Sequence, residues 1–414
     1  MRLLSIMISA DLLFRKTRII SKLRMLLFLQ RTNNTHYREA KKLSGWQVEI
    51  CDVTLRDGEQ APGVVFSPEE KQEIAGLLDE AGINCIEAGF PAVSAGELAS
   101  VRAVASLGLD AKISCLCRAA AADVNAALDA DVSMVNIFLG VSDLHMRCKF
   151  HEPREKVVAS AMDVVEYAKD HGLFVRFAAE DASRTTMKDL LAVYAACENS
   201  RADMIGFSDT TGCLIPSEIA AAVENITHSS KLPLSVHCHN DLGCAVANTI
   251  TAASAGAFQL HTCVNGIGER AGNAALDEVL VILRCIGGVD RYDLSLMPKL
   301  SSVVAEASGI QISKSKPLTG EYAFSHESGI HVAAMLEDPV TYEYVPPELL
   351  GRQRQFLIGK HSGRKALEYV LREMGITAND KEITRILEEI KARSEKKCSI
   401  TFPALRELIE KLQK

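Results

Sequence analysis

The chain has 414 residues, which is too long for one small domain and fits a barrel of about 250 residues followed by smaller units. Apolar residues make up 48% of the chain and charged residues 24%, as in an ordinary globular enzyme. No apolar run reaches the roughly 18 residues of a membrane span, and a net charge of -7 does not indicate nucleic-acid binding. The composition therefore favours a cytoplasmic enzyme that acts on small molecules.

The first 45 residues differ from the rest of the chain, because they hold ten Lys and Arg residues against two acidic ones. A basic leader that is poor in acidic residues can be an organelle transit peptide. It can also be a translated upstream stretch, with Met25 as the start of the protein. We expect residues 1–45 to be a basic extension, either disordered or transit-like, so organelle import stays open.

The 12 cysteines are scattered, and no CxxC pair occurs. Several of them, including Cys51, Cys85 and Cys238, lie inside apolar runs. We therefore expect buried free thiols in a reducing compartment rather than disulfides or a cysteine metal site.

From residue 46 on, short β-branched runs alternate with longer helical patterns. This alternation, repeated eight times, predicts an α/β fold, a (β/α)8 TIM barrel, with an open doubly wound sheet as the alternative. The expected helices include residues 68–81, 94–106, 157–171 and 216–225. The expected strands are residues 48–52, 85–89, 113–117, 134–139, 174–179, 204–208, 234–239 and 258–264.

The alternation stops after about residue 295. Residues 300–345 are rich in Ser, Gly, His and Tyr, whereas residues 365–375 and 380–413 carry Leu and Ile at helical spacing. We predict a catalytic barrel over residues 46–295, a linker or lid subdomain over 296–364 and a small helical subdomain over 365–414.

The strongest chemical signal is His237-Cys238-His239 at the end of the seventh expected strand. Residues i and i+2 of a strand point to the same face, so both imidazoles can reach one cation at the mouth of a barrel. The structural alternative is a pair of histidines that cap the strand and hydrogen-bond to neighbours.

Asp57 follows the first strand and Asn273 follows the eighth, in a glycine-rich segment. The first and eighth strands of a closed barrel are neighbours, and the seventh lies one further on. Asp57, His237, His239 and Asn273 can therefore share one divalent cation, and this mixed nitrogen and oxygen set suits Zn²⁺, Mn²⁺ or Mg²⁺. Taken singly, Asp57 or Asn273 can instead be a turn residue.

Other polar residues also fall at expected strand ends. Arg56, beside Asp57, can stabilise negative charge that develops on an enolate or alkoxide. Glu87, Arg176, Glu180 and Thr210 look like a cage for a small polar acid, although each can also belong to an internal salt bridge.

Outside the barrel, the polar segment His326-Glu327-Ser328-Gly329-Ile330-His331 is followed by Tyr342. This region is either a lid that delivers an acid or base to the barrel mouth or a linker with structural histidines.

The motifs DVTLRDGEQ, IEAGFP, HCHNDLG, NGIGERAGNA, HESGIH and GKHSG, in this order over roughly residues 47–375, resemble the 2-isopropylmalate synthase and homocitrate synthase family. The resemblance implies a Claisen-type condensation of acetyl-CoA with a 2-oxo acid on a homodimeric, metal-dependent barrel. A hydroxymethylglutaryl-type acyl-CoA lyase is a less favoured class, because the HESGIH and GKHSG regions follow the barrel here.

The resemblance also implies roles for residues. Asp57, His237, His239 and Asn273 match metal positions, and His331 with Tyr342 resembles a catalytic pair that comes from the partner subunit. The expected catalytic residues are Arg56, Glu180, His331 and Tyr342. The expected substrate-binding residues are Arg56, Gln60, Glu87, Ser142, His145, Arg176 and Thr210.

The 2-oxo acid is less clear from the sequence. The chain ends about 50 residues after GKHSG, which resembles homocitrate synthases of the nitrogenase or methanogen type and implies 2-oxoglutarate. Lysine-pathway homocitrate synthases place a His at the position of Leu116 to hold the distal carboxylate. Arg118 or Arg147 would then have to replace that His, while 2-oxoisovalerate and pyruvate remain alternatives.

Overall fold

The computed structural model describes residues 45–395 and 402–412, so the expectations for the basic extension lie outside the described residues. The chain divides into two compact units. One contains the barrel and runs to Ile312, and the other contains the residues from Ser313 on.

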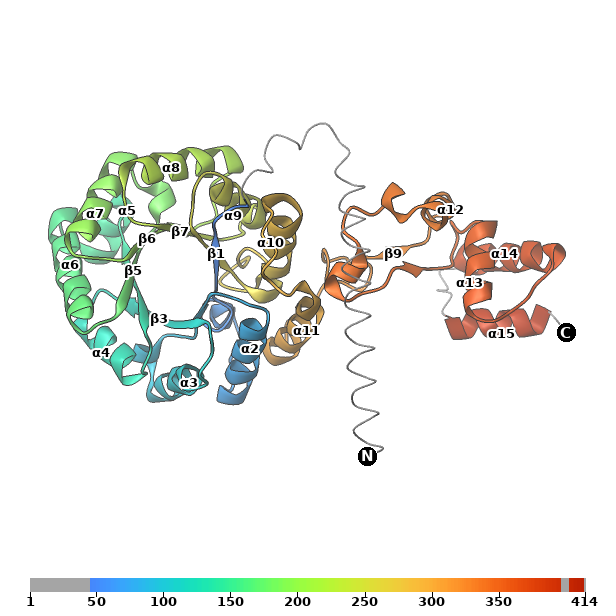
Figure 1. The fold of residues 1–414 in the computed structure, drawn as a ribbon, viewed down its shortest axis with the longest axis horizontal. Helices are drawn as coiled ribbons and strands as arrows, with labels where there is room; N and C mark the ends of the chain where they lie inside the picture. The colour runs from blue at the N-terminus through green and yellow to red at the C-terminus, as the bar shows by residue number, and fades with distance from the viewer. Residues whose placement is uncertain (1–44, 396–401, 413–414) are drawn as a thin grey trace, which may run out of the picture. The chain divides into compact units, whose positions relative to one another are not determined.

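Eight parallel strands form a closed barrel in the order in which they occur in the chain. In Figure 1 they form a ring with helices outside it. This architecture confirms the predicted TIM barrel and excludes the open doubly wound sheet. The strands are β1 (Glu49–Asp52), β2 (Cys85–Glu87), β3 (Lys112–Arg118), β4 (Met134–Gly140), β5 (Phe174–Glu180), β6 (Met204–Asp209), β7 (Leu234–Cys238) and β8 (Gln259–Thr262).

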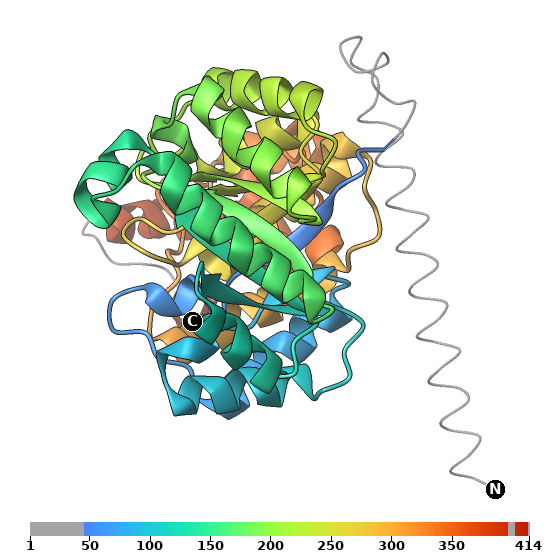
Figure 2. The same ribbon diagram turned by 90° about the vertical axis from the view of Figure 1, so that its left-hand side faces the viewer.

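Some helices of the barrel unit begin at a residue whose side chain caps the helix, as at Ser67. Ser67 accepts a hydrogen bond from the Glu70 amide, Glu70 bonds back to the Ser67 amide, and Pro68 opens the helix. Figure 2 shows helices that cover the strands from outside. They are α2 (Pro68–Glu80), α3 (Ala95–Ala105), α4 (Ala121–Asp129), α5 (Asp143–His145), α6 (Arg154–Asp170), α7 (Met187–Asn199), α8 (Pro216–Ser229), α9 (Ala245–Ser254), α10 (Leu276–Ile282) and α11 (Met297–Ser308).

The barrel interior is not uniformly apolar. Val135, Ile137, Val175 and Phe177 are fully buried on β4 and β5, as expected for strands that are covered on both faces. Arg176 is also fully buried, as are several polar groups on other strands. The strands therefore bring charged side chains into the protein interior, where each needs a partner.

The second unit begins with a two-stranded sheet of β9 (Ser325–His326) and β10 (Gln355–Phe356). Its helices are α12 (Gly329–Glu337), α13 (Arg364–Glu373), α14 (Asp380–Glu395) and α15 (Phe402–Leu412). The expected helical stretch over 380–413 corresponds to two helices, and α12 lies in the region for which no helix was predicted. Leu367, Ile386 and Leu408 lie in one hydrophobic core that these helices share.

Two expectations drawn from composition bear on the described residues. None of the helices in residues 45–395 and 402–412 is long and apolar enough to cross a membrane. Each cysteine in the same ranges is a free thiol, and most of these thiols are buried, although Cys148 and Cys213 are exposed.

Asp52, the last residue of β1, makes the stability of the barrel depend on pH. Burial raises the pKa of this carboxyl to about 7, although Thr54 and Thr262 donate hydrogen bonds to it. The folded state then binds the proton more tightly than the unfolded chain, so the free energy of unfolding falls as the pH rises from about 4 to about 7. Asp52→Asn keeps an acceptor for Thr54 and is expected to remove this slope, an effect of the order of a few kcal/mol.

Urea unfolding of both proteins between pH 4.5 and pH 8 measures this effect, and Asp163→Asn, at an exposed position on α6, is the matched control. Parallel pH profiles of the wild type and Asp52→Asn would contradict the prediction.

Candidate active site

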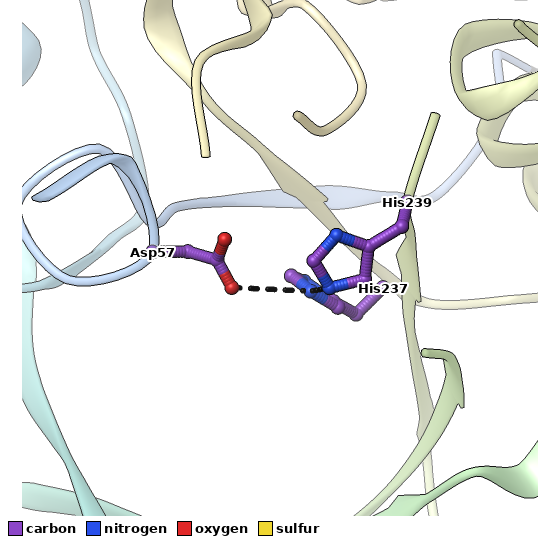
Figure 3. Close-up of side chains that lie close together, drawn as sticks. All are labelled: Asp57, His237 and His239. Atoms are coloured by element: carbon purple, nitrogen blue, oxygen red, sulfur yellow. Dashed lines mark hydrogen bonds and ion pairs between the residues drawn. The ribbon is translucent and has the colours of Figure 1, made fainter. Parts of the chain in front are cut away.

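Three buried side chains converge at the mouth of the barrel. Asp57 lies in the turn after β1, His237 is on β7, and His239 follows the last residue of that strand. Figure 3 shows the Asp57 carboxylate facing the two imidazoles from the opposite side. The Nε2 atoms of the two histidines are 3.1 Å apart, and the Oδ2 atom of Asp57 is 3.5 Å from Nε2 of His237.

The local backbone explains this convergence. His237 and His239 are two residues apart, and an antiparallel β-bridge to Asn273 keeps the chain extended beyond β7. Asn273 donates a hydrogen bond from Nδ2 to Oδ1 of Asp57 at 2.9 Å. Gly268 makes this approach possible, because a Cβ at that position would lie 2.2 Å from Nδ2 of Asn273.

The residues present fit a divalent cation. Two ligands on one ion, at right angles and with bonds of about 2.1 Å, lie about 3 Å apart, which is close to the spacing of the two Nε2 atoms. One ligand atom each from Asp57, His237 and His239 lies within 4.8 Å of the others. The Oδ1 atom of Asn273 is buried and has no hydrogen-bond partner in the described part of the chain, so it remains available as a further ligand.

The electrostatics of the cluster favour the protonation states in which these side chains bind a metal ion. Burial alone would raise the pKa of Asp57, but Arg56, His237 and His239 hold the pKa of this carboxyl well below its usual range. Burial, together with the neighbouring His237, lowers the pKa of His239 to about 3. Near neutral pH the cluster therefore offers a carboxylate and a neutral imidazole, which are the forms that bind metal ions.

Arg56 is fixed beside the cluster by three acceptors. Its guanidinium bonds to Asp57 at 2.6 Å, to Gln60 at 3.2 Å and, through Nε, to Glu87. Glu87 is fully buried and also binds Arg176. Burial would raise the pKa of Glu87, but the two arginines lower it, so the residue stays ionised and anchors Arg56 from below.

Lys71 of α2 supports the same loop, and nothing in the sequence indicated this role. The side chain is fully buried, with Nζ 2.7 Å from a Glu59 oxygen and 2.9 Å from Glu97. A lysine in a helical pattern ordinarily predicts a solvated surface. Here it links Glu59, two residues after Asp57, to Glu97 in the first turn of α3.

A cavity of about 250 Å³ opens beside the cluster. Arg56, Asp57, Gln60, Glu180, Thr210, His237 and His239, all named from the sequence, line it. Leu116 also lines it, as do several residues that the sequence did not single out. These residues are Asn136, Phe138, Ala178, Gly206, Phe207, Ser208, Ser235, His261, Glu269 and Arg270.

The other residues expected in the site lie elsewhere. Arg176 is fully buried on β5, where it binds Glu87, Gln259 and Cys51. Ser142 caps α5 by accepting a hydrogen bond from the His145 amide, and the His145 ring lies 3.8 Å from Glu180 and from Asp181. These contacts give structural roles to Arg176, Ser142 and His145.

His331 and Tyr342 belong to the second unit. Their rings stack with centroids 4.0 Å apart and an interplanar angle of 22°. His331 is exposed, and Tyr342 is 45% exposed. The two side chains therefore form one accessible pair on the unit that follows the barrel.

Comparison with known proteins extends these observations. Residues 47–304 match the HMGL-like family, and residues 318–398 match the homocitrate synthase post-HMGL domain-like family. The chain is 48% identical to the homocitrate synthase AksA of Methanosarcina mazei, over 88% of this chain and 91% of that protein. It is 43% identical to a probable 2-isopropylmalate synthase of Ignicoccus hospitalis, over 88% of this chain and 92% of that protein.

Among solved structures, the hydroxymethylglutaryl-CoA lyase of Pseudomonas aeruginosa matches with a TM-score of 0.59 and 19% identity, over 64% of this chain and 95% of that one. At this identity the likeness shows the fold alone.

The barrel, with its Asp-His-His cluster at the mouth, places the protein in the class of HMGL-like enzymes. The chain belongs to the homocitrate synthase and 2-isopropylmalate synthase family, acyltransferases that condense acetyl-CoA with a 2-oxo acid. This finding confirms the family and the reaction class that the sequence motifs predicted.

His237→Ala is expected to lose the bound divalent ion and catalytic turnover together, because it removes one of three convergent ligand groups. Metal content per chain, measured by plasma mass spectrometry after purification, checks the first effect, and release of the CoA thiol checks the second. His228→Ala, at an exposed position on α8, is the control. Full activity of metal-stripped wild-type protein would contradict the assignment.

Proposed function

We propose that the protein is a homocitrate synthase, which joins acetyl-CoA to 2-oxoglutarate, and that Asp57, His237, His239 and Asn273 hold one Mn²⁺, Mg²⁺ or Zn²⁺ ion. The observation that carries the proposal is the convergence of Asp57, His237 and His239 beside Arg56 at the mouth of the cavity. The 48% identity to a homocitrate synthase over most of both chains supports the choice of substrate.

A divalent ion in this site would polarise the keto group of the 2-oxo acid. Arg56 is positively charged and held beside Asp57, so it stabilises the negative charge that the keto oxygen gains as the new carbon–carbon bond forms. Gln60 and Thr210, which also line the cavity, orient the 2-oxo acid.

The proton chemistry is assigned to Glu180 and to the His331–Tyr342 pair. Glu180 lines the cavity and is held by Lys149, whose Nζ lies 2.6 Å from a carboxylate oxygen. A base, His331 in this proposal, removes a proton from the methyl group of acetyl-CoA, and the resulting enolate attacks the keto carbon. Water then cleaves the thioester, which releases the free CoA thiol and makes the condensation irreversible.

A second candidate is 2-isopropylmalate synthase, because Leu116 and Phe138 give the cavity an apolar wall that suits 2-oxoisovalerate. The related 2-isopropylmalate synthase at 43% identity supports the same alternative. We also propose a cytoplasmic location, which the free cysteines of the described residues support.

Thiol release with 2-oxoglutarate, 2-oxoisovalerate, pyruvate and oxaloacetate, each with acetyl-CoA, tests the substrate. We expect 2-oxoglutarate to give the highest kcat/KM. The highest value with 2-oxoisovalerate would identify a 2-isopropylmalate synthase instead, and no thiol release with any of the four would refute the synthase.

We further propose a homodimer in which His331 and Tyr342 complete the cavity of the partner subunit. Arg56→Ala and His331→Ala are each expected to be inactive alone. In randomly mixed dimers, half the molecules combine the two variants and one site in each is intact, so the mixture is expected to recover about a quarter of wild-type activity.

The measurement is the thiol-release rate after the two variants are mixed under dissociating conditions and returned to assay buffer, with each variant treated alone as the control. If His331 acts within its own subunit, every mixed site carries one substitution, and no activity returns.

A further inference from the structure

His261, on β8, is a buried histidine that the proposed reaction does not use. Its side chain lines the cavity and is 4% exposed, and its ring centroid lies 5.4 Å from that of His237. Neither ring nitrogen has a hydrogen-bond partner among the residues that the structure describes. Buried polar atoms are ordinarily paired, so an unpaired donor on a cavity wall indicates a group that binds there.

Small side chains surround this part of the cavity. Ala178, Gly206 and Ser235 lie on the consecutive strands β5, β6 and β7, and all three line the cavity. Gly206 is tightly placed, because a Cβ there would lie 3.0 Å from Oγ of Ser235 and 3.2 Å from Cα of Ala178. This wall of the cavity therefore presents short side chains on three consecutive strands.

A diacid such as 2-oxoglutarate needs a donor for its distal carboxylate. Of the two arginines that line the cavity, Arg56 lies beside Asp57, where the proposed reaction uses it at the keto oxygen, and Arg270 makes two bonds to Asp241. The buried Asn136 also lines the cavity, and its Nδ2 donates to Glu87 at 3.0 Å.

The arginines named from the sequence do not fill this role either. Arg118 is paired with Asp123 through two nitrogens, and its side chain is 61% exposed. Neither Arg118 nor Arg147 lines this cavity. Outside the Asp57 cluster, His261 is a nine-tenths buried side chain of the lining that has neither of its polar side-chain atoms paired with the described residues.

We propose that His261 donates a hydrogen bond to the distal carboxylate of the 2-oxo acid and so selects diacids over monoacids. The proposal rests on the proposed function, because it takes the other end of the substrate to lie at the Asp57 cluster. Leu116 and Phe138 then contact the methylene groups between the two ends, which agrees with their apolar character.

Two variants and two substrates test the proposal. His261→Leu fills a similar volume without a donor, and His261→Gln retains an amide donor. 2-Oxoglutarate is compared with 2-oxohexanoate, which has a similar reach and no distal carboxylate. In His261→Leu we expect kcat/KM for 2-oxoglutarate to fall by about tenfold to a hundredfold, because a hydrogen bond to a charged group is lost. We expect kcat/KM for 2-oxohexanoate to change by less than about threefold, because this substrate has no distal carboxylate. His261→Gln is expected to recover part of the loss.

Calorimetric titration with 2-oxoglutarate, without acetyl-CoA, is expected to show a similar rise in Kd for His261→Leu. Both variants are checked for wild-type metal content and melting temperature, and His261→Gln carries the comparison if His261→Leu does not fold.

An equal loss for both substrates would assign His261 a structural role and overturn the proposal, and so would an unchanged kcat/KM for 2-oxoglutarate. The wild type alone tests the proposed function. If that function is wrong, the wild-type protein turns over no 2-oxo acid or prefers 2-oxoisovalerate.

Discussion

The burial of an ionised Asp57 is the constraint on which the rest of the site depends. A carboxylate removed from water needs opposite charge and hydrogen bonds around it. Arg56 and Asn273 supply these on the protein side. Arg56 in turn requires Glu87, and Glu87 requires Arg176, which is fully buried. Charges of alternating sign therefore run from the mouth of the barrel into its interior, and each charged residue forms an ion pair with the next.

Barrel closure is what makes this arrangement possible. Asp57 and His237 are far apart in the chain, but β1 pairs with β8, and β8 pairs with β7. The loop after β8 then lies between them and brings Asn273 against both Asp57 and His239. An open sheet would leave β1 and β8 at separate edges. The cluster is therefore a consequence of the topology as much as of the ligand types.

The sequence predicted the strands from the alternation of short β-branched runs with helical patterns. It predicted the cluster from the strand period of two that puts His237 and His239 on one face, together with the closure of the barrel. The same period does not fix how deep a residue lies. Glu87 and Arg176 were expected to hold substrate; both are fully buried and paired with each other, and neither is among the residues that line the cavity. Lys71 was not singled out, because a lysine on a helix has no local signal that distinguishes a buried ion pair from a solvated side chain.

The proposed reaction and the choice of substrate involve different residues of the cavity wall. In the proposed reaction, the groups that polarise the keto carbon are those of the Asp57 cluster at the mouth. The distal part of the 2-oxo acid would then contact other residues of the same wall, such as Ala178 and His261. Leu116, on β3, is apolar and lines the cavity, but it does not decide against a diacid, because contact with methylene carbons requires no charge there. In the further proposal, the distal carboxylate is bound by the unpaired imidazole of His261, which lies beside His237. A site of this kind can change substrate through a few residues of the cavity wall while Asp57, His237 and His239 stay as they are.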